Sequence, residues 1–563
     1  MAFFNTFYDL KTATAYNTHT VGTFDTNTST GGGTFRWVKA TNTSITDIPG
    51  FRIKPSGTTT GYWERVYDGE VNVGWFGTIN TAGQGTLASF GFTQPQLDAR
   101  YGSANLVLTT DTYDTAAIKY AFYLMQTQAG FQSIKFESKN YYITSTCYLP
   151  GLFQSSPNPV YYTIDGNGAT IRAHGTLSTA IDYFGSRLPA NSTEAATWQA
   201  RAFNISKFVM YGQGDLTIGT QAACICLGES YNSLITNNII SYAGYGIKAR
   251  FCMNTVISHN NVVNYRLDGI FVTYGSDWGG STSNGASNHT TIYKNRLRGY
   301  PASGKGIHAR GASGIVIDGN IWEGDPVSAG THAVYFDNAG ATTVKECTIR
   351  STHIERPHTA GGSFFYVRGT TGMYTIEKPY VQYAGTLVEV ATQSGYPEIK
   401  LSGIGYIPNA CKLKSDTNAR WIVEHNVLPS VYGITTDSTL RTGAWAAGDN
   451  STIWYTGYRS TTSNAISSGT KTFVITPNAV GYTAGSTIRI EPSSNSDQGL
   501  DNVEAMRYMT GTITSYNSVT GDLVVSITTT SGSGTYADWT MWIGEYTPTS
   551  NRIVYFGTNT QGG

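Results

Sequence analysis

Charge is scarce in this chain of 563 residues. Asp, Glu, Lys and Arg together make up 13% of the sequence, and 37 basic residues balance 37 acidic ones. Proteins that bind nucleic acid or anionic membranes through bulk electrostatics carry a basic surface. The composition therefore predicts that neither nucleic acid nor a membrane surface is a partner held by charge.

Long apolar runs and a leader segment are also missing. No stretch approaches the roughly 20 consecutive apolar residues of a transmembrane helix, so we expect no membrane insertion. Residues 1–10 lack the basic n-region and the apolar h-region of a signal peptide. If the protein acts outside a cell, we expect a route other than ordinary secretion to deliver it.

Cysteine is rare, with six residues in the whole chain. That number is too small for a disulfide framework in a chain of this length. Cys224-Ile225-Cys226 is spaced too tightly for an ordinary zinc pair, and His353 and His358 lie five residues apart in a loop, a weak ligand pattern. We therefore predict buried core cysteines, no metal site and no cofactor.

One pattern is present four times: an Asn with a mostly apolar pair, followed after a gap by a small residue and an apolar one. The four copies are Asn238-Ile239-Ile240 with Gly246-Ile247, Asn261-Val262-Val263 with Gly269-Ile270, Asn295-Arg296-Leu297 with Gly306-Ile307, and Asn320-Ile321-Trp322 with Ala333-Val334. The first two Asn are 23 residues apart, and the later spacings are 34 and 25. Such a period, stretched by insertions, predicts a parallel β-helix in which each repeat adds one coil.

The two ends differ from the repeats. Residues 1–75 contain short alternating runs typical of a small β domain, such as Thr34-Phe35-Arg36-Trp37-Val38 and Tyr62-Trp63-Glu64-Arg65-Val66-Tyr67. Residues 114–129 have the only convincing helical spacing, which predicts a helix that caps the first coil. We predict the β-helix body over 76–420, a connecting segment over 421–465 and a β module over 466–563.

Three motifs in fixed order carry a family resemblance. They are Val71-Asn72-Val73-Gly74-Trp75-Phe76-Gly77, Asp114-Thr115-Ala116-Ala117-Ile118 and Ile164-Asp165-Gly166-Asn167-Gly168-Ala169-Thr170-Ile171. Over about residues 70–410 the chain resembles the pectate-lyase-like superfamily of right-handed parallel β-helices, in the form found in bacteriophage tailspikes and capsule depolymerases. It departs from that pattern between Gly77 and Asp114. More weakly, 75 or so residues after Gly469 resemble a β module at the ends of phage tail proteins, which implies trimer assembly or receptor contact.

The alternation of side chains along each strand nominates one outward surface. If the residues at the small–apolar start point inward, the next outward pairs are Lys248/Arg250, Phe271/Thr273, His308/Arg310, Tyr335/Asp337, Tyr366/Arg368 and Glu389/Ala391. This stripe mixes aromatic, basic and acidic groups. It is either a functional surface or an unusually ring-rich solvated face.

Two carboxyl groups on the stripe suit glycoside hydrolysis, which needs one acid and one base or nucleophile. Asp337 and Glu389 fall two rungs apart, at roughly 10 Å if rungs are about 4.8 Å apart, a spacing that would suit an inverting pair. Either could instead only pair with Arg310 or Arg368. Further candidate carboxylates stand where loops leave the coil: Asp268, Asp277, Glu323, Asp325 and Glu355. A site shared between subunits is an open alternative.

A different chemistry is β-elimination on a uronic acid, which needs a base and a cation. His308 and Arg310 point the same way on one strand, with Lys248 and Arg250 two rungs earlier. A lone His on a solenoid surface can equally be a polar filler. Hydrolysis and elimination therefore both stay open.

Rings dominate the expected substrate contacts. Aromatic residues make up 13% of the chain, including 38 Tyr and 11 Trp, although Tyr is also simply a good strand former. The candidate binding residues are Phe271, Tyr274, Asp277, Trp278, Tyr335, Tyr366 and Arg368. Trp278 lies on the longest inserted loop and is the first choice for a sugar contact.

The resemblance implies a function. It predicts a homotrimeric tailspike on the virion tail, joined to a tail or baseplate protein, which binds and depolymerises a bacterial surface polysaccharide at the host surface. The alternatives are a polysaccharide lyase and an adhesin that cuts nothing. Residues 1–75 are short for a virion-binding domain, so either such a domain was removed or attachment is through another protein.

Overall fold

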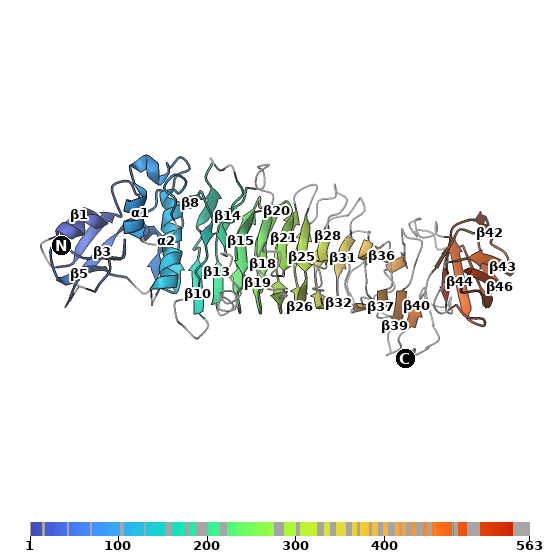
Figure 1. Ribbon diagram of the computed structural model, residues 1–563. Helices are drawn as coiled ribbons and strands as arrows, with labels where there is room; N and C mark the ends of the chain where they lie inside the picture. The colour runs from blue at the N-terminus through green and yellow to red at the C-terminus, as the bar shows by residue number, and fades with distance from the viewer. Residues whose placement is uncertain are drawn as a thin grey trace. The chain divides into compact units, whose positions relative to one another are not determined.

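A computed structural model describes the chain, with gaps, from residue 2 to residue 543. The described residues are 2–13, 17–41, 44–67, 70–101, 106–128, 131–151, 160–175, 177, 179–186, 201–213, 222–274, 287–299, 304–323, 332–337, 345–355, 363–368, 372–381, 386–391, 398–402, 411–415, 419–423, 431–434, 443–447, 453–455, 458–475, 477, 482–492 and 507–543. The chain divides into two compact units, Met1–Thr291 and Ile292–Gly563. The described helices all lie near the N-terminus, at the blue end of the colour scale in Figure 1.

The first unit begins with a small sheet of five strands in the order β1-β2-β3-β5-β4. Its strands are β1 (Ala2–Thr6), β2 (His19–Thr23), β3 (Gly31–Thr41), β4 (Arg52–Ile53) and β5 (Thr60–Arg65), with the 3-10 turn η1 (Phe7–Thr12) after β1. Trp63 on β5 is fully buried and meets Trp37 of β3 edge to face at 5.0 Å. The strands predicted around Trp37 and Trp63 are therefore confirmed.

The predicted capping helix is α2 (Tyr113–Thr127). It lies against β8 (Asn140–Ile143) and β9 (Cys147–Tyr148), the first strands of two coil sheets. Asp114 of the helix is fully buried and accepts hydrogen bonds from the amides of Ile79, Asn80 and Tyr142 and from the Gln84 side chain, at 2.7–3.1 Å. Burial raises the pKa of Asp114, and these bonds oppose that rise. Asp114 therefore joins the capping helix to the coil.

The expectation of a single helix is wrong. A second helix, α1 (Gln94–Tyr101), follows the 3-10 turns η2 (Val73–Phe76) and η3 (Leu87–Phe90). Within α1 only Leu97 and Tyr101 are buried. Two buried positions in eight residues are too few to show a helical period, which is why the pattern missed α1.

In the first unit the coil winds through three parallel sheets, called here the first, second and third sheet. The first sheet contains β6 (Val71–Asn72), β7 (Ser133–Lys135), β10 (Val160–Asp165), β13 (Arg201–Ser206), β16 (Leu234–Thr236) and β19 (Val256–Ser258). The second contains β8, β11 (Thr170–Ala173), β14 (Val209–Tyr211), β17 (Ile239–Ser241) and β20 (Asn261–Tyr265). The third contains β9, β12 (Phe184–Gly185), β15 (Ala223–Gly228), β18 (Tyr245–Arg250) and β21 (Asp268–Thr273). Each coil thus places one strand in each sheet, as the repeats predict.

The first unit ends with β22 (Ser287–Asn288) and with Thr291, the first residue of β23 (Thr291–Tyr293). The strands of the second unit are assigned to the first, second and third sheets in the same way. The first contains β23, β26 (Ala312–Asp318), β29 (Lys345–Arg350), β32 (Met373–Glu377), β35 (Glu398–Ser402), β37 (Ala419–Val423) and β39 (Gly443–Ala447). It ends with β40 (Ile453–Tyr455), which pairs antiparallel with β39. The second contains β24 (Arg296–Gly299), β27 (Ile321–Glu323), β30 (His353–Ile354) and β33 (Tyr380–Val381). The third contains β25 (Lys305–Arg310), β28 (His332–Asp337), β31 (Ser363–Arg368), β34 (Thr386–Ala391), β36 (Cys411–Ser415) and β38 (Val431–Ile434). Parallel pairing continues past residue 420, since β37 pairs with β39 and β36 with β38.

Buried asparagines stack at the turn between the first and second sheets. Asn238 donates its amide and its side-chain N–H to Oδ1 of Asn260, at 3.0 and 2.9 Å. Asn295 does the same to Asn320 at 2.9 and 3.0 Å. The repeat Asn of the second copy is therefore Asn260, which is a correction, because Asn261 pairs in register with Ile239 on β17. Two adjacent Asn in the sequence allowed this one-residue error.

The residue before each of these asparagines has a positive φ. The angles are 56° at Asn237, 55° at His259, 49° at Lys294 and 60° at Gly319. A left-handed residue turns the chain sharply enough to start the next strand without a loop. The sharp corner and the Asn stack together fix where the second sheet begins.

Cysteines fill the core, as predicted. Cys147, Cys224, Cys226, Cys252 and Cys347 are free thiols and buried. Burial raises the pKa of both Cys147 and Cys226 to about 12. The side chain of Cys411 lies outside the described residues.

The described C-terminal strands form an antiparallel sheet in the order β41-β48-β44-β45-β46-β43, with a short ribbon of β42 and β47. Their bounds are β41 (Tyr458–Ser460), β42 (Asn464–Ala465), β43 (Gly469–Val474), β44 (Thr487–Pro492), β45 (Tyr508–Tyr516), β46 (Asp522–Ser531), β47 (Thr535–Tyr536) and β48 (Trp539–Ile543). Phe473, Ile490, Leu523 and Trp539 belong to its own apolar core. The small β domains expected at both ends of the chain are thus present.

Candidate functional site

Four consecutive strands of the third sheet, β25, β28, β31 and β34, present polar and aromatic side chains outward in register. Each strand begins with one outward residue, continues with two inward ones, and then alternates. Gly306 is one of the inward pair, and a Cβ there would lie 2.6 Å from the carbonyl oxygen of Ala333. This close approach explains the glycine on β25, whereas Phe364 and Leu387 take the same inward position on β31 and β34.

The outward positions form three columns, which we call the leading, middle and trailing columns of the third-sheet face. The leading column contains Lys305, His332 and Ser363; the middle column His308, Tyr335, Tyr366 and Glu389; the trailing column Arg310, Asp337 and Arg368. The sequence predicted the middle and trailing columns. It missed the leading column, although Lys305 and His332 each stand directly before a small–apolar start, which was the signal.

The middle column is a stack of rings that ends in a carboxyl group. Tyr335 and Tyr366 stack with ring centroids 5.0 Å apart and planes 4° apart, and His308 meets Tyr335 edge to face at 4.9 Å. Glu389 is the register neighbour of Tyr366 on the next strand. Although these side chains point outward, His308, Tyr335 and Glu389 are only 2%, 8% and 8% exposed. Because the rings cover one another, they offer edges and hydroxyls rather than open faces to a sugar.

The leading column connects to the carboxyl group. The Ser363 hydroxyl donates a hydrogen bond to Glu389 Oε2, and the Ser363 amide donates to Nδ1 of His332 at 3.2 Å. The His332 ring lies 4.5 Å from that of Tyr366, and Lys305 Nζ lies 4.9 Å above the ring of Tyr335. Glu389 is therefore held by a hydroxyl in a ring-lined, largely buried setting.

Charges alternate along the trailing column. Arg310 donates two hydrogen bonds to Asp337 Oδ2, at 3.2 and 3.0 Å. Arg368 on β31 is exposed and hydrogen-bonds the Tyr335 phenol, which raises the pKa of Arg368. Burial raises the pKa of Tyr335, and the bond from Arg368 opposes that rise. This column is the more accessible edge of the face.

The two candidate carboxylates lie two rungs apart, as expected, but in different columns. Two rungs of about 4.8 Å and two residues of about 3.3 Å place their Cα atoms about 12 Å apart. Asp337 turns back to Arg310, while Glu389 turns to the leading column. Their side chains diverge in this state. The Arg310 pairing considered for Asp337 is present.

In the first unit the third sheet carries a smaller cluster of the same kind. Tyr245 and Phe271 stack at 5.5 Å and 17°, and Lys248 Nζ lies 4.5 and 5.2 Å from their ring centroids. Phe271 is only 3% exposed and Thr273 is fully buried, whereas Arg250 is half-buried. Phe271 thus has little surface left for a sugar.

The further candidate carboxylates do not gather at one site. Glu323 receives a hydrogen bond of 2.8 Å from Arg296, and Glu355 lies 3.6 Å from His353; both lie on or just after strands of the second sheet, off the third-sheet face. Asp268 is buried at the start of β21. Asp277, Trp278 and Asp325 lie outside the described residues, so their assignments stay predictions.

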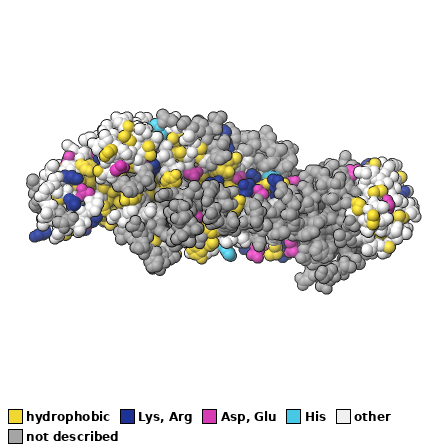
Figure 2. Space-filling view, viewed as in Figure 1, with side chains coloured by type: hydrophobic (Ala, Val, Ile, Leu, Met, Phe, Trp, Pro, Cys, Tyr) yellow, Lys and Arg dark blue, Asp and Glu magenta, His cyan; other side chains and the backbone are white. Residues whose placement is uncertain are grey.

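Within the described part of the chain, no group of three or more His, Cys, Asp or Glu residues is arranged to hold a metal ion. No helix among those residues is long and apolar enough to cross a membrane. In Figure 2 the described basic and acidic side chains are interspersed, with histidine atoms among them.

The comparisons with known proteins agree with this architecture. A family model described as "Right handed beta helix region" matches residues 223–399. The coil is therefore a right-handed parallel β-helix, as predicted. No curated protein matches the chain.

Among solved structures, the chain is similar to the tailspike protein of Acinetobacter phage vB_ApiP_P1, at 11% identity and a TM-score of 0.46, over 96% of this chain and 98% of that one. It is similar to the tailspike protein gp49 of Acinetobacter baumannii bacteriophage Fri1, a capsular polysaccharide depolymerase, at 10% and 0.32, over 99% and 100%. It is also similar to PfbA, a surface adhesin of Streptococcus pneumoniae, at 12% and 0.38, over 73% and 97%.

Proposed function

We propose that the protein binds and depolymerises a bacterial surface polysaccharide, capsule or O-antigen, by hydrolysing glycosidic bonds on the third-sheet face. The observation that carries the proposal is the middle column, where the stacked pair Tyr335 and Tyr366 leads to the hydroxyl-bonded carboxyl of Glu389. A general acid works best when its carboxyl is shielded from bulk water and positioned by a neighbour. Glu389 meets both conditions.

In this proposal Glu389 protonates the leaving oxygen and Asp337 activates a water molecule. Asp337 lies on the accessible edge of the face, where Arg310 holds its carboxylate. Before cleavage Glu389 would turn from Ser363 and Asp337 from Arg310 toward the bond between them. With Cα atoms about 12 Å apart, the two carboxyl groups would then leave room for a water molecule, which favours inversion over retention. Tyr366 and Arg368 would contact the sugars beside the cleaved bond.

The setting of this activity is inferred from the three sequence motifs. We propose a homotrimeric tailspike on the virion tail that is attached to a tail or baseplate protein and acts at the host surface. The similar structures include both a depolymerase and an adhesin by name, so the choice between cleavage and binding has to come from the residues of this chain.

A lyase is the second candidate, because one observation favours it. His308 is buried beside Tyr335 and shares its strand with Arg310, so a base and a cation point to the same side. Elimination on a uronic acid requires that pair of groups. In this alternative Asp337 only positions Arg310.

The test is to incubate the full chain with capsular polysaccharides from a panel of host bacteria. Reducing ends and the ultraviolet absorbance of an unsaturated uronate are followed together. New reducing ends without absorbance, lost in Glu389→Gln and Asp337→Asn, are expected. Absorbance that rises with the ends and disappears in His308→Ala would replace hydrolysis by elimination, and demonstrated binding without either signal would leave an adhesin.

A matched control distinguishes chemistry from structure. Glu377 on β32 pairs with Arg350 on the neighbouring strand at 3.0 Å, as Asp337 pairs with Arg310, but on the first sheet. Glu377→Gln should keep full activity. Equal losses in Asp337→Asn and Glu377→Gln would show that any broken rung-to-rung ion pair harms the fold, and would remove the case for Asp337.

A further inference from the structure

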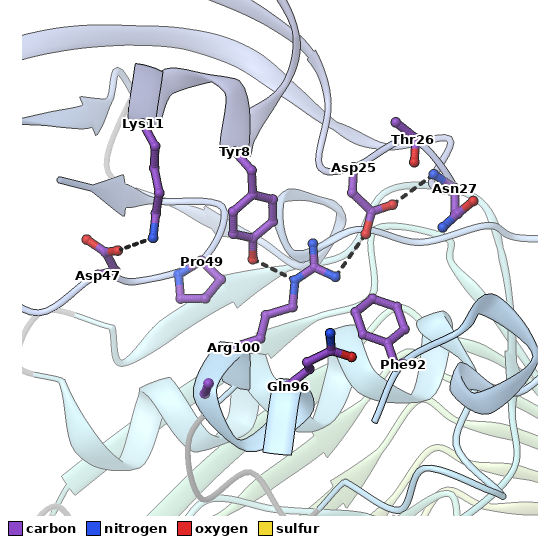
Figure 3. A pocket seen from close by; sticks show the side chains of 11 residues that line it. Tyr8, Lys11, Asp25, Thr26, Asn27, Asp47, Pro49, Phe92, Gln96 and Arg100 are labelled. Atoms are coloured by element: carbon purple, nitrogen blue, oxygen red, sulfur yellow. Dashed lines mark hydrogen bonds and ion pairs between the residues drawn. The ribbon is translucent and has the colours of Figure 1, made fainter. Parts of the chain in front are cut away.

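The N-terminal part of the first unit contains a cavity that no sequence pattern indicated. It has a volume of about 500 Å³ and lies between η1, the turn after β2, and α1 (Figure 3). Small-molecule sites typically measure about 300–1,000 Å³. The size therefore fits one or two sugar rings.

Arg100 of α1 forms the floor of the cavity. Its guanidinium carbon lies 4.3, 4.8 and 5.0 Å from the ring centroids of Tyr8, Phe24 and Phe92. Its Nε donates to the Tyr8 hydroxyl at 2.6 Å, and its Nη1 pairs with Asp25 at 3.0 Å (Figure 3). A guanidinium held on one side by rings and on the other by a carboxylate cannot reorient, so the floor is rigid before any ligand arrives.

The carboxylate of that pair is itself fixed. Asp25 accepts 2.8 Å hydrogen bonds from the Tyr113 hydroxyl and from the Asn27 amide. Burial raises the pKa of Tyr8 to about 12, so its phenol stays neutral at physiological pH. The polar atoms of the floor are thus held in one geometry.

The charges that line the cavity cancel. Besides the pair of Arg100 and Asp25, Lys11 pairs with Asp47 at 3.2 Å. A ligand with net charge would lose hydration there without gaining a complementary net charge in return. The cavity therefore selects against ions.

The groups of the cavity lining that a ligand can contact are hydrogen-bond donors and acceptors next to apolar surface. Among the described residues, Nη2 of Arg100 and the amide nitrogen of Gln96 have no hydrogen-bond partner, while Gln96 Oε1 accepts from the Thr93 amide at 2.8 Å. Pro49 and Phe92 add carbon surface to the lining. Hydroxyls that donate and accept, carried on a ring with C–H faces, match this lining.

We propose that this cavity binds an uncharged saccharide unit, at a site separate from the third-sheet face and independent of the cleavage proposed there. The rigid polar floor would orient the hydroxyls, and the Gln96 amide would close the rim. Because no net charge is involved, the affinity should hardly depend on salt.

The experiment is saturation-transfer NMR on the full chain with named probes. Glucose, galactose, N-acetylglucosamine and rhamnose serve as uncharged sugars, and glucuronate and glucosamine as charged ones. We expect transfer to at least one uncharged sugar, at least about fivefold weaker transfer to the charged pair, and less than twofold change between about 0.05 and 0.5 M NaCl.

Two variants locate the site. Gln96→Glu keeps the oxygen that accepts from Thr93 but replaces the amide donor by a charge, so binding should fall at least about fivefold with an unchanged melting temperature. Gln132→Glu, a half-buried position outside the cavity, should bind like the parent chain. No transfer to any uncharged sugar, equal transfer to charged sugars, or equal losses in both variants would overturn the proposal. Because the readout is binding of single sugars, it does not depend on polysaccharide cleavage.

Discussion

Buried charge is used differently at the start of the chain and on the third-sheet face. At the start, two buried charges bind mainly backbone groups distant in sequence: Asp114 accepts from the amides of Ile79, Asn80 and Tyr142, and Arg65 donates to the carbonyls of Gly31, Gly32 and Gly50 at 2.6–2.7 Å. On the third-sheet face, Glu389 and Asp337 bind side chains of the preceding strand.

The difference separates charges that stabilise the fold from charges that can take part in a reaction. A charge that satisfies backbone groups cannot be removed without leaving buried donors or acceptors unpaired. A charge that meets a side chain one rung away can be exchanged while the ladder of the sheet stays intact. We therefore expect substitutions to unfold the first region and to inactivate the second.

The largest effect should come from Asp114→Ala. Three partly buried amides and the buried Gln84 side chain lose their acceptor, and each unsatisfied group costs about 1–3 kcal/mol, so the loss should reach about 4 kcal/mol. Thermal unfolding and protease resistance of the N-terminal part measure it. Asp98→Ala, which removes an exposed partner of Gln94 on α1, should cost less than about 0.5 kcal/mol. Similar costs for the two would erase the contrast between the regions.

Glu389→Gln should reduce activity and leave stability almost unchanged. It keeps the size of the side chain and an acceptor for Ser363 but removes the proton that a general acid delivers, so turnover should fall at least about 100-fold. The melting temperature should stay within a few degrees of the parent value. Reducing-end release measures the activity, and calorimetry on the same sample measures the melting temperature. A variant that unfolds would show that Glu389, like Asp114, has a structural role.

The Asn stack lies between these extremes and offers a neighbouring pair for comparison. Asn260→Ala removes the acceptor for two N–H groups of Asn238 and should cost about 1–3 kcal/mol. Asn261→Ala, one residue later on a half-buried strand position, should cost less than about 0.5 kcal/mol. Chemical denaturation measures the stability of both variants. Equal losses would mean that Asn260 is not the repeat Asn of the second copy and would restore the assignment of Asn261.

The smallest effect concerns substrate contact at the accessible edge. Arg368→Gln removes an exposed cation beside Tyr335 and should weaken binding of an acidic polysaccharide about two- to fivefold at low salt, less at high salt. Arg350→Gln on the first sheet should leave binding unchanged. Calorimetric titration at two ionic strengths measures this, and a loss that ignores salt would mean that Arg368 acts through packing.

Features that repeat along the chain could be predicted from the sequence. Strand alternation was enough to place His308, Tyr335 and Glu389 in one outward column, because the side-chain period of a strand holds in every coil. The same alternation put Asp337 second in its outward pair and Glu389 first in its own, but the expected distance of roughly 10 Å counted only the rungs and left out this offset along the strand. The leading column was missed because an extra inward residue breaks the alternation after Lys305, His332 and Ser363.

Other features depend on contacts that spacing does not encode. The cavity around Arg100 is lined by segments separated by up to about 90 residues, and none of them repeats. Nor does stacking show in a pattern: Tyr335 and Tyr366 were expected to contact sugars, but the two rings stack on each other. Ring identity is visible in a sequence, whereas ring accessibility is not.

The corner between the second and third sheets tolerates changes in length. Ile240 pairs with Val262 on the second sheet, 22 residues later, while Ile247 pairs with Ile270 on the third, 23 residues later. One additional residue has therefore been absorbed between Val263 and Gly269 without displacing either strand. Evolution can therefore lengthen this corner and so change what surrounds the third-sheet face, because the strand pairing on either side of the corner stays the same after an insertion.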